Sequence, residues 1–415
     1  MSAIPERRRR RLITAVVLGI VALVALPAGL VVSATTLLNS TDGRNVTADS
    51  TIKIPSTPAA LLAGVNSRDE IAMIAVFALA PSGRGGTIVS VPVGSNARIG
   101  RTGTIHRVAD TYRESGFDSF VIDVEGLLNV SFAASAKVDV SELTTMLQVV
   151  GDRTVVVDAD IYDTAIDGSV RQIAVAGEQV MTPEQLASAL LAGQRGTPES
   201  QRLVRMKSLW RAIAGTSLSS PATSAPTTDA IEASTTSTVV PNSANDFFTA
   251  LRSGPIQLWQ FAATAVAQGE RNPTNLDLYD LDRAEVVMVM ASVAPSSVSV
   301  SSTNVSFMID SPFTDASIIK KAVERLILLK VNVLVIRQTG QTAGANTELL
   351  YRDVEVRDAV ENYDAYFGPV VLGEPKERVE GIDVRLVLGE DFRTYLNTPE
   401  GQATPTTTTS TTVPD

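Results

Sequence analysis

Three kinds of residue are scarce in this chain, and each scarcity excludes or disfavours a class of protein. Cysteine is absent, which excludes disulfides, thiolate metal sites and cysteine nucleophiles. Histidine occurs once, as His106, so a two-histidine metal site is excluded and a serine–histidine triad must use that one ring. Aromatic residues make up 5 % of the chain, which argues against a stacking platform for single-stranded nucleic acid.

Basic residues are scarce relative to acidic ones beyond the N-terminus. The 415 residues carry a formal net charge of −10. Residues 1–41 contain one acid, Glu6, and the arginines of residues 7–11, so they contribute +4 and the remainder −14. Duplex binding needs many lysine and arginine contacts to phosphate, so an acidic body disfavours it, and no nucleic-acid partner is expected.

A long apolar run follows the arginines. Residues 12–38 are almost wholly apolar, and no charged residue occurs between Arg11 and Asp42. As a helix rising about 1.5 Å per residue, the run spans roughly 40 Å, enough to cross a hydrocarbon core of about 30 Å with tilt. The basic tail, residues 1–11, places the N-terminus in the cytoplasm. We therefore expect a single-pass membrane protein with a retained signal anchor and an extracytoplasmic bulk; a cleaved signal peptide is the alternative.

Strand-like and helix-like stretches alternate beyond the apolar run, which is typical of an α/β or α+β core. The predicted strands are residues 71–77, 87–91 and 155–161. Residues 117–128 fit either a strand or a helix. Thr182 precedes a proline, an early acid and an apolar run, which predicts a helix starting at residue 183. The other predicted helices are residues 141–149 and 246–267.

Two segments rich in threonine and proline divide the rest of the chain. Residues 216–245 and 401–415 have too few apolar residues to offset their ordering entropy, so we predict a disordered insertion and a disordered tail. Between them, residues 303–396 follow the order β-α-β-β-α-β, which indicates a small split sheet covered by two helices.

Several short stretches are similar to motifs of one protein family. Residues 382–392 read IDVRLVLGEDF, which matches the closing strand of the family's C-terminal domain. Residues 67–73, SRDEIAM, are similar to an Arg-x-Asp-Thr-Ile-Met motif, and residues 87–92, TIVSVP, to the strand before a Ser-Ile-Pro-Arg-Asp motif. Arg202 and Arg205 resemble the arginines of a Gly-Arg-x-x-Arg-Gln signature. The chain thus resembles the LytR–CpsA–Psr family of bacterial cell-envelope proteins.

The resemblance implies both a fold and a chemistry. It implies a mixed-sheet α/β domain over residues 66–295, interrupted by the insertion, and the family's small C-terminal domain over residues 303–396. The resemblance implies the family's activity, the transfer of glycopolymers from polyprenyl-pyrophosphate carriers to the cell wall, with magnesium bridging the pyrophosphate. By resemblance, Asp69 would contact the metal, and Arg202 and Arg205 would contact phosphate. The alternatives are a turn residue for Asp69 and a solvated basic helix face for the two arginines.

The motifs also depart from the family where charge is needed. Residues 92–94 read PVG where the family has Pro-Arg-Asp, and residues 191–193 read LAG at its Arg-x-Arg pair. Splitting a pyrophosphate depends on positioning and on neutralising charge, which these residues cannot supply. We therefore expect a non-catalytic scaffold or polyprenyl-lipid-binding accessory of envelope assembly. We also expect that Val93→Arg with Gly94→Asp would raise metal-dependent activity on an intact scaffold.

The alternative is an active transferase that uses Mg²⁺ and replaces the lost arginines with others. The candidates for this replacement are Arg98, Arg101 and Arg195. On either hypothesis the partners are a polyprenyl-linked glycopolymer or peptidoglycan, and an apolar tunnel holds the lipid. The residues predicted to line that tunnel are Ala72, Ile74, Val76, Leu127, Leu128, Leu143, Leu147, Leu186 and Leu190.

Other residues that could serve in catalysis or in metal binding are interpreted as structural or solvent-facing. His106 is interpreted as a surface or packing residue rather than a general base. The acids at positions 158, 160 and 163 are expected to face solvent, and those at 277, 280 and 282 to lie in a turn, because the latter lack the glycine and glutamate of a calcium loop. Residues 83–86 lack the Gly-Lys-Ser/Thr ending of a phosphate-binding loop.

Overall fold

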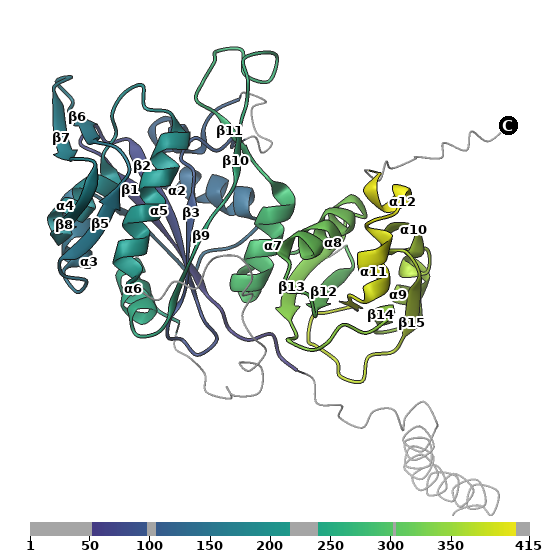
Figure 1. Ribbon diagram of the computed structural model, residues 1–415. Coiled ribbons are helices and arrows are strands. Elements are labelled where there is room, and N and C mark those ends of the chain that lie inside the picture. Colours follow the sequence, from purple (N-terminus) through teal and green to yellow (C-terminus); the bar gives the residue numbers. More distant parts are fainter. Residues whose placement is uncertain (1–51, 98–104, 216–239, 302–303, 404–415) are drawn as a thin grey trace, which may run out of the picture. The chain divides into compact units, whose positions relative to one another are not determined.

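The computed structural model describes residues 52–97, 105–215, 240–301 and 304–403 (Figure 1). The predicted basic tail and signal anchor lie outside these residues, as do most of the predicted insertion and C-terminal tail. Among the described residues, no helix has the length and apolar character needed to cross a bilayer. The anchor over residues 12–38 therefore stays a prediction.

A mixed five-stranded sheet forms the centre of the first region, in the order β4-β1-β2-β3-β9. Its strands are β1 (Ala59–Val65), β2 (Ile71–Leu79), β3 (Gly86–Val91), β4 (Ala134–Val138) and β9 (Ile256–Gln260). The three central strands pair antiparallel, and β4 and β9 add parallel at the two edges. All residues of β1 and β2 are buried, because helices cover both faces of the sheet. The mixed α/β core predicted from the sequence is confirmed.

Two apolar cores lie on opposite faces of this sheet. From Met73 onward, successive residues of β2 alternate between them: Met73, Ala75 and Phe77 join one core, and Ile74 and Val76 the other. The helices of the first core are α3 (Val140–Leu147), α4 (Pro183–Leu191), α5 (Glu199–Ala214) and α6 (Ala244–Arg252). Those of the second are α2 (Val108–Leu128) and α7 (Arg283–Val293). Figure 1 shows α5 crossing in front of the sheet.

Helix boundaries follow local sequence signals. Thr182 caps α4 in a capping box, in which its side chain accepts from the Gln185 N–H and the Gln185 side chain accepts from the Thr182 N–H. The predicted helix start at residue 183 is confirmed. Residues 117–128 are helical, within α2, and α2 is kinked at Gly116, which has φ 85° and ψ 177°.

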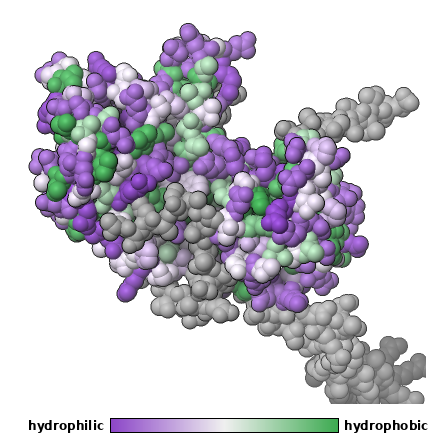
Figure 2. Space-filling model, viewed as in Figure 1, coloured by the Kyte–Doolittle hydropathy of each residue, from purple (hydrophilic) through white to green (hydrophobic). Residues whose placement is uncertain are grey.

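Short two-stranded sheets complete the first region. They are formed by β5 (Arg153–Val157) with β8 (Gly177–Met181), β6 (Ile161–Thr164) with β7 (Val170–Ala174), and β10 (Ala263–Ala265) with β11 (Tyr279–Leu281). Apolar side chains are exposed on two of these sheets: Val156 and Val180 lie on β5 and β8, and Val170 and Ile166 lie on β7 and in the turn before it. Figure 2 shows apolar patches scattered over this end of the visible face.

Three predictions about this region need correction. The predicted strand over residues 155–161 is two strands, β5 and β6, separated by a bend. The predicted helix over residues 246–267 is wrong beyond Arg252, because the chain then pairs with β3 as β9. The sheet also begins before residue 66, since β1 starts at Ala59.

The second region is a five-stranded sheet in the order β13-β12-β16-β14-β15. The strands are β12 (Ser306–Ser311), β13 (Asn332–Gln338), β14 (Thr347–Tyr351), β15 (Val370–Gly373) and β16 (Val384–Val387). The helices are α8 (Ala316–Leu328), α9 (Val354–Val360), α10 (Asp364–Phe367), α11 (Glu390–Tyr395) and α12 (Pro399–Gln402). The predicted order omitted β15, a short strand at the sheet edge, and the last two helices.

A buried charge cluster joins three strands of this second sheet. Asp310 on β12 is fully buried and accepts two hydrogen bonds, of 2.7 Å each, from the Arg337 guanidinium on β13. Arg385 on β16 also donates to the Asp310 carboxylate. One carboxylate thus holds two partly buried guanidinium groups, and removing it would leave both uncompensated.

Candidate functional site

A cavity of about 400 Å³ lies in the first region, where several loops meet beside the central sheet. Its wall combines the turn before β2, the segment after β3, the start of α2, the segment between α4 and α5, and the loop before β11. The arginines that line it are Arg68, Arg107, Arg113, Arg195 and Arg202. The acids that line it are Glu70, Asp110, Glu199 and Asp277.

Arg68 ties the turn before β2 to the far wall of the cavity. Its side chain is only 8 % exposed. Its Nε donates to Glu70 Oε2 over 2.9 Å, and its Nη1 donates to the carbonyls of Thr164 and, over 2.8 Å, Gly193. Burial acts to raise the pKa of Glu70, but the hydrogen bonds from Arg68 and Asn66 outweigh it and hold that pKa below its usual value.

Asp69, the residue that motif resemblance assigns to a metal, is not among the residues that line the cavity. Its backbone is left-handed, with φ 55°, and its side chain is 70 % exposed. The carboxylate accepts from the Tyr112 hydroxyl over 2.8 Å and lies 3.8 Å from Lys137 Nζ. The carboxylate that this turn presents to the cavity is that of Glu70 instead.

The start of α2 adds two more arginines. Arg107, at the N-cap position, donates two hydrogen bonds of 2.8 and 2.7 Å to the Asp110 carboxylate. These bonds raise the pKa of Arg107 further above its usual range, although burial opposes them. Arg113, six residues further along α2, also lines the cavity and is exposed.

Arg202 and Arg205 both lie on α5, but only Arg202 lines the cavity. Arg202 lines the cavity; its Nη2 donates to the Ala72 carbonyl over 2.6 Å, and its Nη1 lies 3.7 Å from Glu199 Oε2. Arg205 is outside the cavity lining and donates to the Ala192 carbonyl over 2.8 Å. Burial, aided by the charge of Arg202, lowers the pKa of Arg205 to about 10. Both guanidinium groups therefore bond to backbone carbonyls rather than form a solvated helix face.

Glu199 is the most enclosed acid of the cavity wall. Its side chain is 5 % exposed, and its Oε1 accepts from the Val93 N–H over 2.9 Å. The Glu199 N–H in turn donates to Asp277 Oδ2 over 2.8 Å. Burial raises the pKa of Glu199; Arg202 and the Val93 hydrogen bond oppose this rise, and Asp277 adds to it.

The position at which the family carries an acid has no room for a side chain here. A Cβ atom at Gly94 would lie 2.8 Å from the Asp277 carbonyl oxygen and 3.1 Å from the Tyr279 ring. Val93 beside it is buried. The expectation that Val93→Arg with Gly94→Asp raises activity on an intact scaffold stays a prediction, and its condition is demanding, because a side chain at position 94 would displace the loop before β11.

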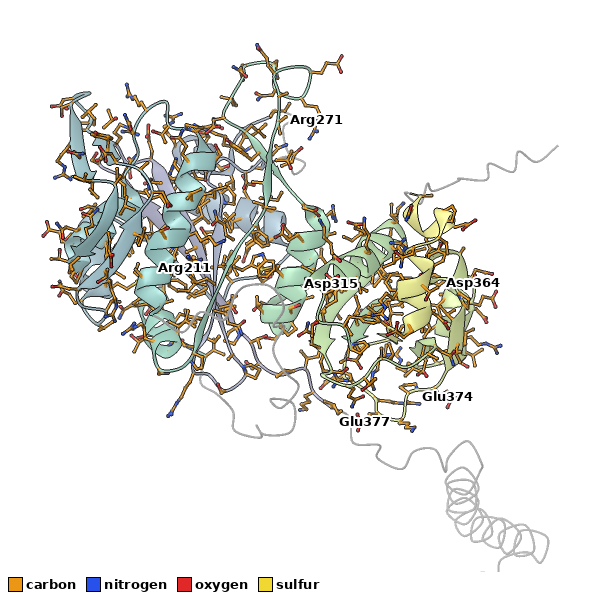
Figure 3. All side chains as sticks on the ribbon, viewed as in Figure 1. Arg211, Arg271, Asp315, Asp364, Glu374 and Glu377 are labelled. Carbon is orange, nitrogen blue, oxygen red and sulfur yellow. The ribbon has the colours of Figure 1, made fainter. Side chains whose placement is uncertain are left out.

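Two of the five arginines form no direct ion pair with a described acid, although the charge of Arg113 helps to lower the pKa of Glu70. Arg68 pairs with Glu70, Arg107 with Asp110 and Arg202 with Glu199, whereas Arg113 and Arg195 make no ion pair with any residue that the structure describes. Both are exposed at the cavity wall. For contrast, Figure 3 labels Arg211, an exposed arginine further along α5 that does not line the cavity.

The acids of the cavity fit a metal ion poorly. Glu70, Asp110 and Glu199 each already accept from a guanidinium or a backbone N–H, and Asp277 accepts from the Glu199 N–H. Within the described ranges, no three acidic or histidine side chains come close enough together to hold a metal. The described residues of this cavity therefore support no reaction step that runs through magnesium.

The remaining sequence candidates lie mostly elsewhere. His106 Nε2 is 3.1 Å from Thr111 Oγ1 and 3.7 Å from Asp123, away from the cavity lining. Asp163 accepts from the Gly193 N–H over 3.0 Å and so helps to fix the cavity wall. Asp282 caps α7. Residues 98 and 101 lie outside the described residues.

A second cavity, of about 240 Å³, lies along the same helix. It is lined by Ile88, Ser90, Lys207, Trp210, Leu258, Trp259 and Gln260. Trp210 is eight residues beyond Arg202, or about 12 Å along α5. The residues predicted to line a lipid tunnel do not gather around it: Ile74 and Val76 pack in one core, and Leu143 and Leu186 in the other.

Sequence reasoning missed most of the cavity. Arg107, Arg113 and Glu199 carried no motif signal, Arg68 and Glu70 lay in a motif-like stretch without being given a role, and Asp277 was placed in a turn. Of the charged residues of the cavity, only Arg202 and Arg195 were given a phosphate role beforehand, the first by resemblance and the second as a replacement arginine. A local signal existed for one pair alone, since Arg107 and Asp110 have the i, i+3 spacing of a helical ion pair.

The comparisons with known proteins find structures but no sequence families. No family model matches the chain, and no curated protein matches it. Among solved structures, B. subtilis TagV is similar with 17 % identity and a TM-score of 0.39, covering 56 % of this chain and 94 % of TagV. B. subtilis TagT is similar with 14 % identity and a TM-score of 0.38, covering 56 % of this chain and 88 % of TagT.

A third similar structure is described as TagT bound to LI-WTA, with 15 % identity, a TM-score of 0.39, and coverage of 56 % of this chain and 88 % of that one. TagV and TagT are members of the LytR–CpsA–Psr family, which this chain resembles. At these identities and scores the likenesses carry no argument about function, and the function proposed below rests on the cavity.

Proposed function

We propose that this chain is a cell-envelope protein that binds the diphosphate of a polyprenyl-linked glycopolymer in the arginine-lined cavity, and that it holds the polymer without transferring it. The sequence-based expectation of a membrane anchor completes the proposal: the folded regions face the cell wall, where the carrier and peptidoglycan are found. Polymer and acceptor are proposed only as classes.

The observation that carries the proposal is the excess of arginines over acids in the cavity wall. Five arginines and four acids line it, so the wall has one positive charge in surplus. Three of the arginines form ion pairs with acids of the wall, and Arg113 and Arg195 are exposed beside them. Guanidinium forks fit phosphate oxygens two at a time, so an anionic diphosphate matches the sign of this surplus.

The other residues of the cavity wall support binding of the diphosphate rather than cleavage of its phosphate bond. Leaving-group departure from a diphosphate needs charge neutralisation beyond that used for binding. The acids of the cavity are engaged with N–H groups or guanidinium groups, and Gly94 leaves no space for another. The pocket thus supplies donors for a bound diphosphate and lacks a group free to hold a metal.

The second cavity supports an amphiphilic ligand. Helix α5 presents Arg202 to the charged cavity and Trp210 to the smaller one about 12 Å away. Ile88, Leu258 and Trp210 give the smaller cavity an apolar surface. A molecule with an anionic head and an apolar chain would match the charged cavity and the apolar cavity that follow each other along α5.

The experiment that tests the proposal is a titration of the purified chain with farnesyl diphosphate, with farnesol as the control that lacks the phosphates. We expect saturable binding of the diphosphate, weak binding of the alcohol, and no release of phosphate when Mg²⁺ is added. Equal binding of the two compounds would reject the arginine cavity as the recognition site.

One observation favours the second candidate, an active transferase. Arg195 lies in the cavity wall, two positions from where the family's Arg-x-Arg pair aligns, so a displaced arginine is available. Magnesium-dependent phosphate release in the titration above, abolished by Arg195→Ala, would establish this function in place of the first.

A further inference from the structure

Glu199 occupies donors that an anionic ligand would use. Its carboxylate accepts from the Val93 N–H over 2.9 Å and lies 3.7 Å from the Arg202 guanidinium, and its side chain is 5 % exposed. A backbone N–H beside a guanidinium is the kind of donor pair that binds phosphate oxygens. A protein carboxylate therefore already stands in the wall of the cavity that we assign to the diphosphate.

An ionised Glu199 and a bound diphosphate are in conflict. The carboxylate would repel the phosphates in a poorly solvated place, where charges interact strongly. A protonated Glu199 removes the conflict, because it keeps its Oε1 bond to the Val93 N–H while its O–H can donate to a phosphate oxygen. The charge on this one side chain thus decides how well the cavity accepts an anion.

We propose that Glu199 is a specificity-determining carboxyl that takes up a proton from solvent when the diphosphate binds, so that ligand binding is proton-linked. This inference rests on the proposed function and adds a regulatory property to the same site. No covalent bond changes: one proton moves from solvent to Glu199 for each diphosphate bound.

The charged groups that face Glu199 come from three elements. Arg202 and Arg205 on α5 and Arg107 before α2 favour the ionised form, whereas Asp277 before β11 disfavours it. Burial is the largest influence and raises the pKa of Glu199. A bound diphosphate adds two negative charges and raises that pKa further. Affinity for the ligand must then increase as the pH falls from the pKa of Glu199 in the complex to its lower pKa in the free protein, and level off below that.

The test is isothermal titration with a dialkyl diphosphate, whose two negative charges do not change over the pH range used. Titrations in two buffers of different ionisation enthalpy count the protons taken up, and a pH series gives the slope of affinity. For the wild-type chain we expect uptake approaching one proton per ligand and affinity rising by up to tenfold per pH unit as the pH falls.

Three variants separate the possible causes. Glu199→Gln should bind more tightly at high pH, with no proton uptake and a flat pH profile. Asp277→Asn removes a neighbouring negative charge, so it should move the midpoint of the profile to lower pH. Glu285→Gln is the matched control, because Glu285 is another acid whose pKa is raised by burial, but it lies outside the cavity and accepts from Trp259. It should behave as the wild type.

Each result has one reading. Binding by the wild type without proton uptake, or a pH profile that Glu199→Gln leaves unchanged, would overturn the role of Glu199 and leave the proposed function standing. If Glu199→Gln fails to fold, the number of protons taken up by the wild type and the midpoint of the pH profile of Asp277→Asn still test the role of Glu199. Failure of both the wild type and Glu199→Gln to bind at any pH would overturn the proposed function, and the inference with it.

Discussion

Replacing Arg195 with alanine removes a guanidinium group from the cavity wall while leaving the described contacts of the fold intact. The Arg195 side chain is exposed and makes no ion pair with any described residue. Its backbone N–H donates to Thr164 Oγ1 over 3.3 Å, a bond that alanine keeps. The variant therefore tests ligand binding without a matching loss of stability.

The expected loss follows from the kind of contact removed. A hydrogen bond to a charged group contributes roughly 1.5–3 kcal/mol when the site is shielded from water. Because Arg195 is exposed, solvent screening reduces this to about 1–2 kcal/mol. The dissociation constant for a prenyl diphosphate should then rise by about five- to thirtyfold. Added salt should weaken wild-type binding more than that of Arg195→Ala, since the variant has one fewer charge to screen.

The assay is a calorimetric titration of farnesyl diphosphate at fixed pH and salt, together with a urea unfolding curve for each variant. Arg211→Ala is the matched control, since Arg211 is an exposed arginine on α5 that does not line the cavity (Figure 3). It should bind as the wild type does.

Equal weakening by Arg195→Ala and Arg211→Ala would refute the reasoning, because the effect would then come from net charge rather than from the cavity. Unchanged binding in Arg195→Ala would remove Arg195 from the site.

Three further predictions concern stability, each read from the midpoint of urea unfolding. Gly94→Ala places a Cβ 2.8 Å from a backbone carbonyl oxygen and should cost about 1–3 kcal/mol, whereas Gly269→Ala, with nothing within 4 Å, should cost less than that; equal effects would contradict the packing argument. Asp310→Asn leaves two guanidinium groups without their carboxylate and should cost about 3–5 kcal/mol, so an unchanged midpoint would mean that solvent compensates them. Thr182→Ala removes the cap of α4 and should cost about 1 kcal/mol, while Thr182→Ser should restore most of it.

The parts of the fold that were predictable are those that local chemistry decides. The start of α4 follows from local residues: the Thr182 and Gln185 side chains accept from each other's backbone N–H, and Pro183 has the fixed φ that suits a first helical position. The strands β2 and β3 are apolar runs bounded by turns, and no distant contact is needed to recognise them.

The parts that were missed depend on distant partners. β1 is an apolar run buried on both faces, so it shows no alternation that would distinguish it from the linker before it. β9 was predicted as helix, and it is a strand because it pairs with β3, some 170 residues earlier in the chain. A single sequence contains no signal for that pairing.

The site was harder to predict than the fold, for two physical reasons. Motif alignment selects Asp69, but the structure places the neighbouring Glu70 in the cavity lining and leaves Asp69 out of it. Glu199 begins a helix, where acids are usually explained by the helix dipole. Its burial against the Val93 N–H becomes visible only when the chain is folded.

The measurement that tests the central claim most directly is mass spectrometry of lipids extracted from the chain purified from the cells that produce it. The account predicts that a polyprenyl phosphate or diphosphate co-purifies with the wild type and is largely lost from the Arg113→Ala, Arg195→Ala double variant. Absence of any prenyl phosphate from the wild type, or equal recovery from the double variant, would contradict it.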